Sequence, residues 1–167
     1  DWRRINAEAL VMGVVRAGDG DVVSVDFRLF DVAAASELRG LRFTVPRAQW
    51  RRVAHKIADE VYSRITGDGG YFDTRIVYVA ESGLPTQRVK RLAIMDQDGA
   101  NHRYLTRGDA LVLTPRFAPD GRNVAYLSYG YRRPQVALLD VETGQETVIG
   151  DFPGMTFSPR FSPDGRY

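Results

Sequence analysis

The sequence contains no cysteine, two histidines and no long apolar run. The absence of cysteine excludes disulfide bonds and thiolate metal sites, although it is compatible with either redox compartment. Neither His55 nor His102 has a second histidine at ligand spacing, so no metal site is expected. Since no apolar run approaches the roughly 20 residues needed to cross a bilayer, the chain is predicted not to span a membrane.

Motifs of catalysis and cofactor binding are also missing. There is no Gly-x-Ser-x-Gly segment, no phosphate-binding glycine loop and no dinucleotide fingerprint. We therefore expect neither an enzyme nor a cofactor. The net charge is only +2, from 23 basic and 21 acidic residues, and the arginines are scattered in pairs. A nucleic-acid surface more often concentrates them in one stripe, so no nucleic-acid partner is expected.

The first part of the sequence predicts a small sheet. Ala9–Val15 is a continuous apolar run, as expected of a strand that is buried on both faces, and Asp21–Val32 alternates with a period of two. Between them, Asp19-Gly20 favours a hairpin turn, because these residues tolerate positive φ. Leu41–Val45 is predicted to be a third strand after a glycine-containing turn.

A long helix is predicted from Pro46 to Thr66. Pro46 is tolerated in a first helical turn, and Gly67 suits a C-terminal cap. The helix is expected to cover the sheet and to bury Trp50, and Gly67–Asp73 has the composition of a linker. We therefore predict an α/β domain at 1–69 and a second domain at 70–167. The apolar helix residues that share one face are Trp50, Val53, Ala54, Ile57, Val61 and Ile65.

An internal repeat dominates the second half. The phrase Pro-Arg-Phe-x-Pro-Asp-Gly-Arg begins at Pro115 and again at Pro159, 44 residues further on, and Leu92–Asp96 falls on Val136–Asp140 at the same step. A period of this length that holds four short strands is typical of a β-propeller blade. The predicted fold class is therefore an α+β N-terminal domain followed by an all-β propeller, of which the sequence holds one full blade and parts of two others.

The strands of these blades follow from the pattern. An earlier blade has three predicted strands and lacks an innermost one. Asp120 and Asp164 lie in repeated Pro-Asp-Gly turns, so we expect them to accept backbone hydrogen bonds rather than to bind an ion or to act as acids. The full blade comprises Leu111–Ala118, Asn123–Ser128, Gln135–Val141 and Glu146–Ile149, and the earlier blade comprises Thr74–Val79, Arg91–Met95 and His102–Leu105.

The order of these segments resembles the TolB family of the Tol-Pal system. The most specific stretch is "PRAQWRRVAHKIADEVYSRITG" followed by "YFDTRIVYV", and the repeated "SPDG" turns agree with it. The resemblance implies a six-bladed propeller in the parent and a non-enzymatic periplasmic scaffold that binds the lipoprotein Pal and TolA. Such a scaffold supports outer-membrane integrity, cell division and protein transport.

The sequence departs from that family at both ends. The family's N-terminal domain begins with a further strand, helix and strand, and the segment that engages TolA lies at its extreme N-terminus. Both are missing here, so we interpret the sequence as a fragment. The resemblance implies that the innermost strand of the first blade comes from the far end of the parent chain. The open blade edges are expected to favour self-association.

The resemblance also implies a partner-binding site. In the family, Pal covers one mouth of the propeller channel and touches loops that lead into the innermost strands, here Gly108–Thr114 and Asp151–Ser158. Their apolar residues suit either an interface or the gap between blades. Met155 stands where the family can carry a histidine. The predicted partner-binding residues are Leu111, Val112, Leu113, Thr114, Met155, Thr156, Phe157 and Ser158.

Two other functions remain open from the sequence alone. Similar blades form the propeller of prolyl-oligopeptidase-like serine hydrolases, here without the catalytic domain. A propeller that binds a sugar or another small ligand is the third possibility. The parent sequence beyond Tyr167 separates the first two, since further blades indicate the scaffold and a Gly-x-Ser-x-Gly segment indicates the hydrolase.

Overall fold

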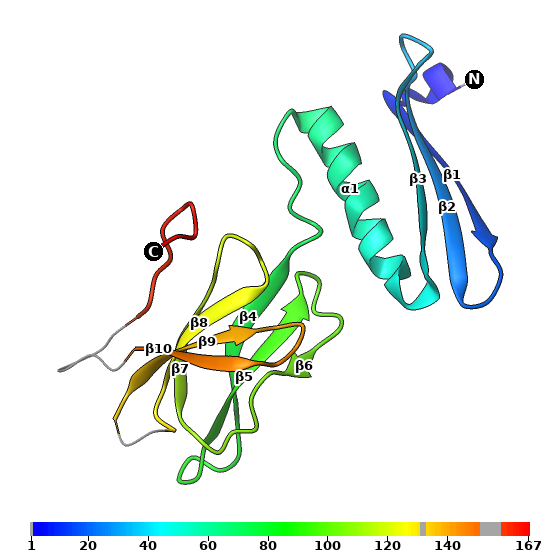
Figure 1. Cartoon of the computed structure of the whole chain (residues 1–167). Coiled ribbons are helices and arrows are strands. Elements are labelled where there is room, and N and C mark those ends of the chain that lie inside the picture. The colour runs from blue at the N-terminus through cyan, green and yellow to red at the C-terminus, as the bar shows by residue number, and fades with distance from the viewer. Residues whose placement is uncertain (1, 131–132, 151–157) are drawn as a thin grey trace. The chain divides into compact units, whose positions relative to one another are not determined.

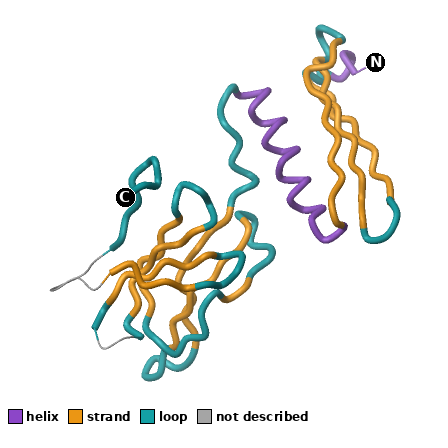
Figure 2. Tube along the Cα trace, viewed as in Figure 1, coloured by secondary structure: helices purple, strands orange, loops and turns teal. Residues whose placement is uncertain are grey.

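The computed structural model describes residues 2–130, 133–150 and 158–167. The chain divides into two compact units between Asp73 and Thr74. The first unit holds three strands and one long helix, and the second holds two blade-type sheets, which confirms the predicted fold class (Figures 1 and 2). The elements of the first unit are the 3-10 helix η1 (Trp2–Ile5), β1 (Ala9–Ala17), β2 (Val22–Asp31), β3 (Ser36–Pro46), the 3-10 helix η2 (Arg47–Gln49) and α1 (Trp50–Thr66).

The sheet of the first unit is an antiparallel meander in the order β1-β2-β3. The predicted hairpin joins β1 to β2, and Gly20 has a φ of 70° there. The prediction of a glycine-containing turn before the third strand is wrong. The turn between β2 and β3 spans Val32–Ala35 and contains no glycine. The Asp31 carboxylate accepts the Ala34 N–H at 2.7 Å and holds this turn. Gly40 lies inside β3 instead, opposite Arg28.

The helix starts later than predicted. Pro46 has an extended conformation and ends β3, opposite Val22, so the chain makes a single 3-10 turn before α1 begins at Trp50. The C-terminal end agrees with the prediction. Gly67 has a φ of 80° and donates its N–H to the Ser63 carbonyl at 3.0 Å, as a left-handed cap does.

Two predictions of burial are wrong. Trp50 is 55% exposed, and the run Ala9–Val15, predicted to be buried on both faces, forms a largely exposed outer strand. Both differences have one physical cause. The helix packs mainly on β2 and β3, with Phe27 and Leu29 of β2 and its own Val53 buried, and it leaves β1 and its own first turn uncovered.

The segment that follows the helix is docked on it. The Asp59 carboxylate accepts the N–H of Phe72 at 2.7 Å and the N–H of Asp73 at 3.1 Å. The Tyr71 and Phe72 rings stack at 4.5 Å between centroids, and both meet Tyr62 edge-on. We call Tyr71–Asp73 the docked segment. It follows that the linker-like composition of this region does not correspond to a free linker.

The second unit contains two antiparallel sheets. One has the order β4-β5-β6 and the other the order β10-β9-β8-β7. The four-stranded sheet is the predicted full blade. The three-stranded sheet has no innermost strand beside β4 within the described residues, as predicted for the earlier blade. The strands are β4 (Arg75–Ser82), β5 (Val89–Asp96), β6 (Arg103–Tyr104), β7 (Val112–Phe117), β8 (Asn123–Ser128), β9 (Gln135–Asp140) and β10 (Glu146–Gly150).

The repeated phrase builds the same turn twice. Ala118 donates its N–H to the Asn123 carbonyl at 2.8 Å, and Ser162, 44 residues later, donates to the Tyr167 carbonyl at 2.7 Å. Gly121 and Gly165 follow the turn aspartates with φ values of 65° and 70°. The local sequence therefore specifies the turn geometry wherever it occurs.

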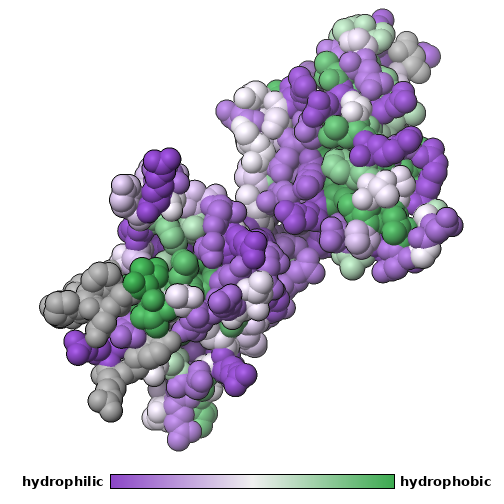
Figure 3. Space-filling view, in the orientation of Figure 1, coloured by the Kyte–Doolittle hydropathy of each residue, from purple (hydrophilic) through white to green (hydrophobic). Residues whose placement is uncertain are grey.

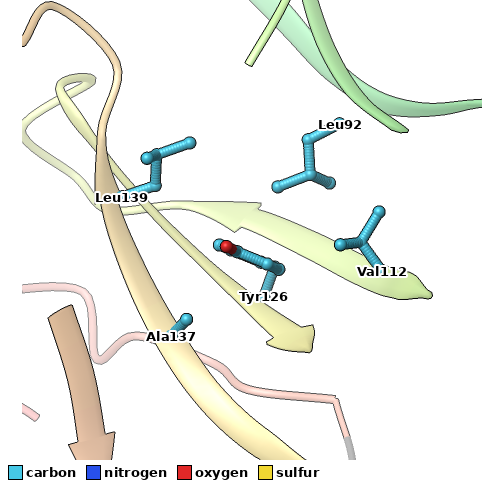
Figure 4. Packing of buried hydrophobic residues seen from close by; sticks show 5 residues of the cluster. All are labelled: Leu92, Val112, Tyr126, Ala137 and Leu139. Atoms are coloured by element: carbon cyan, nitrogen blue, oxygen red, sulfur yellow. The ribbon is translucent and has the colours of Figure 1, made fainter. Parts of the chain in front are cut away.

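The core of the second unit lies between the two sheets. Five buried side chains from four strands pack together, and Tyr126 lies at the centre of the group (Figure 4). Arg75 links the blades at one rim by donating to the Gly121 carbonyl at 2.8 Å and to the Glu142 carboxylate at 2.7 Å. Stacking thus buries faces that a single blade would expose. The five residues are Leu92, Val112, Tyr126, Ala137 and Leu139.

Candidate functional site

The residues that lead into the predicted loop before β7 are hydrogen-bonded to β5. Leu105 donates its N–H to the Leu92 carbonyl at 2.7 Å, and the Thr106 hydroxyl accepts the Leu92 N–H at 3.0 Å. The Arg91 side chain donates from Nε to the Arg107 carbonyl at 2.9 Å and lies over the Tyr104 ring. The loop between β6 and β7 is therefore attached to β5 at its base.

Gly108 makes this close approach possible. Its φ is 90°, and a Cβ at this position would lie 2.5 Å from Cγ1 of Val89 and 2.9 Å from Nε of Arg91. Any other residue would therefore combine backbone strain with a steric clash. The predicted partner-binding loop thus begins at a residue, Gly108, that packs closely against β5.

Two neighbouring residues of this loop differ sharply in exposure. Leu111 is 41% exposed, whereas Val112 is 2% exposed and belongs to the core between the blades. The structure therefore gives Val112 a packing role. Tyr129, which is not among the predicted site residues, is also exposed and donates its N–H to the Leu111 carbonyl at 2.9 Å. Leu111 and Tyr129 thus present neighbouring apolar surface at one rim.

Thr114 adopts a left-handed backbone conformation with a φ of 50°, and Ser158, at the equivalent position of the repeat, has a φ of 30°. Such a conformation costs about 1–3 kcal/mol at a residue other than glycine. The pairing of β7 with β8 is irregular between Leu113 and Arg116, around this residue. The Thr114 hydroxyl oxygen is buried and has no hydrogen-bond partner among the described residues. The strain therefore recurs where each innermost strand enters its Pro-Arg-Phe phrase.

A polar hollow of about 410 Å³ lies beside Val112 and Tyr126. Hydroxyl, guanidinium and carboxylate groups line it together, so it suits a polar side chain better than an apolar one. The Ser128 hydroxyl at its edge accepts the Gly130 N–H at 3.3 Å. The polar residues of this hollow include Thr106, Arg107, Asp109, Ser128 and Glu146.

Of the other predicted site residues, Leu113 is partly exposed and Ser158 is exposed. Met155, Thr156 and Phe157 lie outside the described residues. The structure therefore places Leu111 to Thr114 in one continuous segment at the entry to β7. The partner-binding role of these residues stays a prediction.

The turn aspartates at the opposite rim serve the backbone. Asp120 accepts the N–H groups of Arg122 at 2.8 Å and Asn123 at 2.9 Å, which confirms the predicted role. These hydrogen bonds lower the pKa of the Asp120 carboxyl, and the bond from the Asn123 N–H has the largest effect. The Arg122 side chain lowers the pKa of Asp140 from 3.8 to about 2, with help from the N–H groups of Thr143 and Glu142. Both groups stay ionised near neutral pH and are poor proton donors.

Neither a metal cluster nor a membrane span is found in the part of the chain that the structure describes. Among residues 2–130, 133–150 and 158–167, no three histidine, aspartate or glutamate side chains gather closely enough to hold a metal ion. In the same residues, no helix combines the length and the apolar character needed to cross a membrane.

Comparison with protein families gives two matches. The model of the TolB beta propeller domain matches residues 62–167, and the model of the TolB amino-terminal domain matches residues 1–38. The first of these alone covers more than half of the chain. The amino-terminal model matches within the first compact unit, and most of the propeller match lies in the second unit.

Individual relatives agree with these matches. The chain is 58% identical over 157 residues to the Tol-Pal system protein TolB of Pelagibacter ubique, and 54% identical over 157 residues to that of Paramagnetospirillum magneticum. Each alignment covers 94% of this chain and 35% of the relative. The crystal structure of TolB from Acinetobacter baumannii matches with a TM-score of 0.84 and 31% identity, over 98% of this chain and 41% of that one. The chain thus spans about a third of the length of these curated relatives.

Proposed function

Because this chain belongs to the TolB family, we propose that it forms part of a non-enzymatic binding scaffold of the Tol-Pal system. The scaffold works in the periplasm, binds the lipoprotein Pal at one rim of its propeller and binds TolA through a segment N-terminal to the residues of this chain. These contacts support outer-membrane integrity and cell division.

The observation that carries the proposal is the composition of the rim at the entry to β7. Leu111 and Tyr129 are exposed, adjacent and bonded through their backbones, and the loop beside them is held by Gly108 and Arg91. Exposed apolar and aromatic side chains on a rigid support are typical of interface centres. A preformed loop also loses less conformational entropy when a partner binds.

The neighbouring hollow adds a polar feature to the same rim. Arg107, Asp109 and Ser128 line it with donors and acceptors, and Val112 and Tyr126 line it as well. A partner that buries Leu111 could place a polar side chain there. An apolar centre with a polar surround is the usual arrangement of a protein–protein interface.

The family match favours this scaffold over the hydrolase alternative, because both matched models describe domains of TolB. The geometry agrees with that preference. The Asp120 carboxylate is occupied by turn backbone and that of Asp140 by Arg122, so these two groups do not supply an acid–base pair.

The test replaces Leu111 by Asp in the full-length parent protein, because Pal is expected to cover the mouth of the complete propeller, and measures the affinity for the periplasmic domain of Pal by calorimetry. We expect the affinity to fall by at least about tenfold, because a charge at the centre of an apolar contact is desolvated without a partner. Tyr129→Ala is expected to weaken binding in the same direction. Ile65→Asp is the control, since Ile65 is also an exposed apolar residue but lies in the last turn of α1.

Two results would overturn the proposal. One is an unmodified parent protein that shows no binding to Pal, and the other is a Leu111→Asp variant that keeps its affinity within about twofold. Melting curves of each variant establish that the fold is unchanged, so that a loss of affinity reports the contact and not unfolding.

A further inference from the structure

The sheet of the first unit has a second face that the helix does not cover. Phe27 and Leu29 of β2 are buried on the α1 side, and Val15, Val23 and Val25 line the hollow beside that helix. Because side chains alternate along a strand, the residues between them point away from α1. We call this surface the outer face. It comprises Met12, Val14 and Arg16 of β1, Asp26 and Arg28 of β2, and Arg42 of β3.

One part of the outer face is apolar. Met12 and Val14 are each about half exposed, and Trp2 of η1 is about half exposed as well. Trp2, Met12 and Phe30 line a hollow of about 380 Å³ at the end of the sheet. On the side of the first unit that Figure 3 shows, hydrophobic side chains lie directly beside hydrophilic ones. Tryptophan, methionine and arginine are enriched at interface centres.

The other part carries three arginines. Arg16 and Arg42 approach the Asp26 carboxylate from the two neighbouring strands, one guanidinium on each oxygen, and Arg28 contacts Glu37 at 3.4 Å. All three arginine side chains are more than half exposed. Each guanidinium carries five N–H donors, and only one donor of each takes part in these contacts. Together with Glu37, the outer face thus offers many unused donors and one net positive charge.

The arrangement of these charges limits what can bind. Asp26 and Glu37 lie among the arginines, so a dense polyanion such as a nucleic-acid backbone or an anionic lipid surface would meet two carboxylates along with the three cations. A protein segment can instead set its carboxylates against the guanidiniums and its apolar residues against Met12 and Val14. Bidentate pairing of arginine with carboxylate gives such a contact its direction.

We propose that the outer face docks an acidic, extended segment of a protein partner. The segment lies across the sheet with its carboxylates on Arg16, Arg28 and Arg42, and with apolar side chains on Met12, Val14 and Trp2. This surface is separate from the rim at Leu111, so the proposal stands or falls independently of Pal binding.

The test uses a short fluorescein-labelled peptide of alternating glutamate and leucine, whose binding to this chain is followed by fluorescence anisotropy. We expect saturable binding that weakens as salt is added, because exposed charge pairs are screened. The double variant Arg16→Gln and Arg42→Gln should bind at least about tenfold more weakly. Arg88→Gln is the matched control, since Arg88 is also more than half exposed and also pairs with a carboxylate, that of Glu81 at 2.6 Å, in the second unit.

A second variant protects the test against a loss of fold. Arg28→Gln leaves Asp26 and its two partners intact and should still weaken binding several-fold. Circular dichroism establishes the fold of each variant. Equal binding by the wild type and by both variants would overturn the proposal.

Other occupants of the outer face have their own outcomes in the same experiment. Equal binding of a lysine–leucine peptide would indicate apolar association without charge recognition. Tighter association with phosphatidylglycerol vesicles than with the peptide would indicate a lipid surface. A concentration-dependent dimer that Met12→Asp abolishes would indicate a second copy of the chain. Each of these results would contradict the acidic segment.

Discussion

The sheet of β1–β3 and the sheet of β7–β10 are built from similar strands and differ in what covers them. In the first sheet, β1 is apolar along most of its length and yet exposed, and only β2 carries fully buried side chains. In the second sheet, five of the six residues of β8 are buried. The difference comes from the neighbours. Each blade is covered by its neighbour in the repeat, whereas, among the described residues, the first sheet is covered by α1 alone, which packs on β2 and β3.

The largest expected effect tests whether the two units are stable independently of each other. Leu92 and Leu29 are both fully buried, one in each unit. Replacing either by Ala should cost about 2–5 kcal/mol, because a cavity remains in a packed core. Hydrogen exchange resolved along the chain should show faster exchange only in the unit that carries the substitution. Loss of protection in both units from either variant would contradict their independence.

A smaller effect is expected where the repeat is held by a turn. Replacing Asp120 by Ala removes the acceptor of two backbone N–H groups and should cost about 1–2 kcal/mol. Asp120→Asn keeps an acceptor oxygen and should cost less. The comparison of the two variants in urea unfolding measures how much the carboxylate contributes. Equal stability of Asp120→Ala and the wild type would show that Pro119 and Gly121 alone specify the turn.

The smallest effect concerns pH and compares one carboxylate from each unit. Arg42 and Arg16 lower the pKa of Asp26 from 3.8 to about 2, and Arg122 lowers that of Asp140 to the same value. Because the native state holds these protons less tightly than the unfolded chain, stability is fully present above about pH 5 and falls between about pH 4 and pH 2. Melting temperatures of the wild type and of Asp140→Asn over this range provide the measurement. The variant should lose less stability on acidification, and parallel curves would show that Asp140 does not contribute.

What the sequence predicted well is what depends on local chemistry. Pro119, Asp120 and Gly121 determine a turn within a few residues, and the same turn recurs at Gly165. Strand β8 and the end of α1 were predicted at the observed residues for the same reason, since the period of the apolar residues and the glycine cap are local signals.

The predictions that were wrong concern how elements distant in the sequence pack on one another. The exposure of Trp50 and of β1 depends on where α1 packs, and a hydrophobic run does not encode this. Tyr129 was missed because its pairing with Leu111 joins residues 18 apart through a backbone bond that has no sequence signal. Gly40 was assigned to a turn because glycine is more often found there than in a strand.

The docked segment changes how the region between the two units should be treated in the laboratory. Glycine-rich, polar stretches are the usual targets of proteases and the usual choice for cutting a protein into separate domains. Here Asp59 holds the N–H groups of Phe72 and Asp73, and Gly70 leaves room for that carboxylate because any side chain would lie about 2.3 Å from it. A protease must take its substrate in an extended form, so this bonded stretch should resist cleavage. An expression boundary placed before Tyr71 would remove the two aromatic rings that pack on Tyr62 and leave Asp59 without its backbone donors.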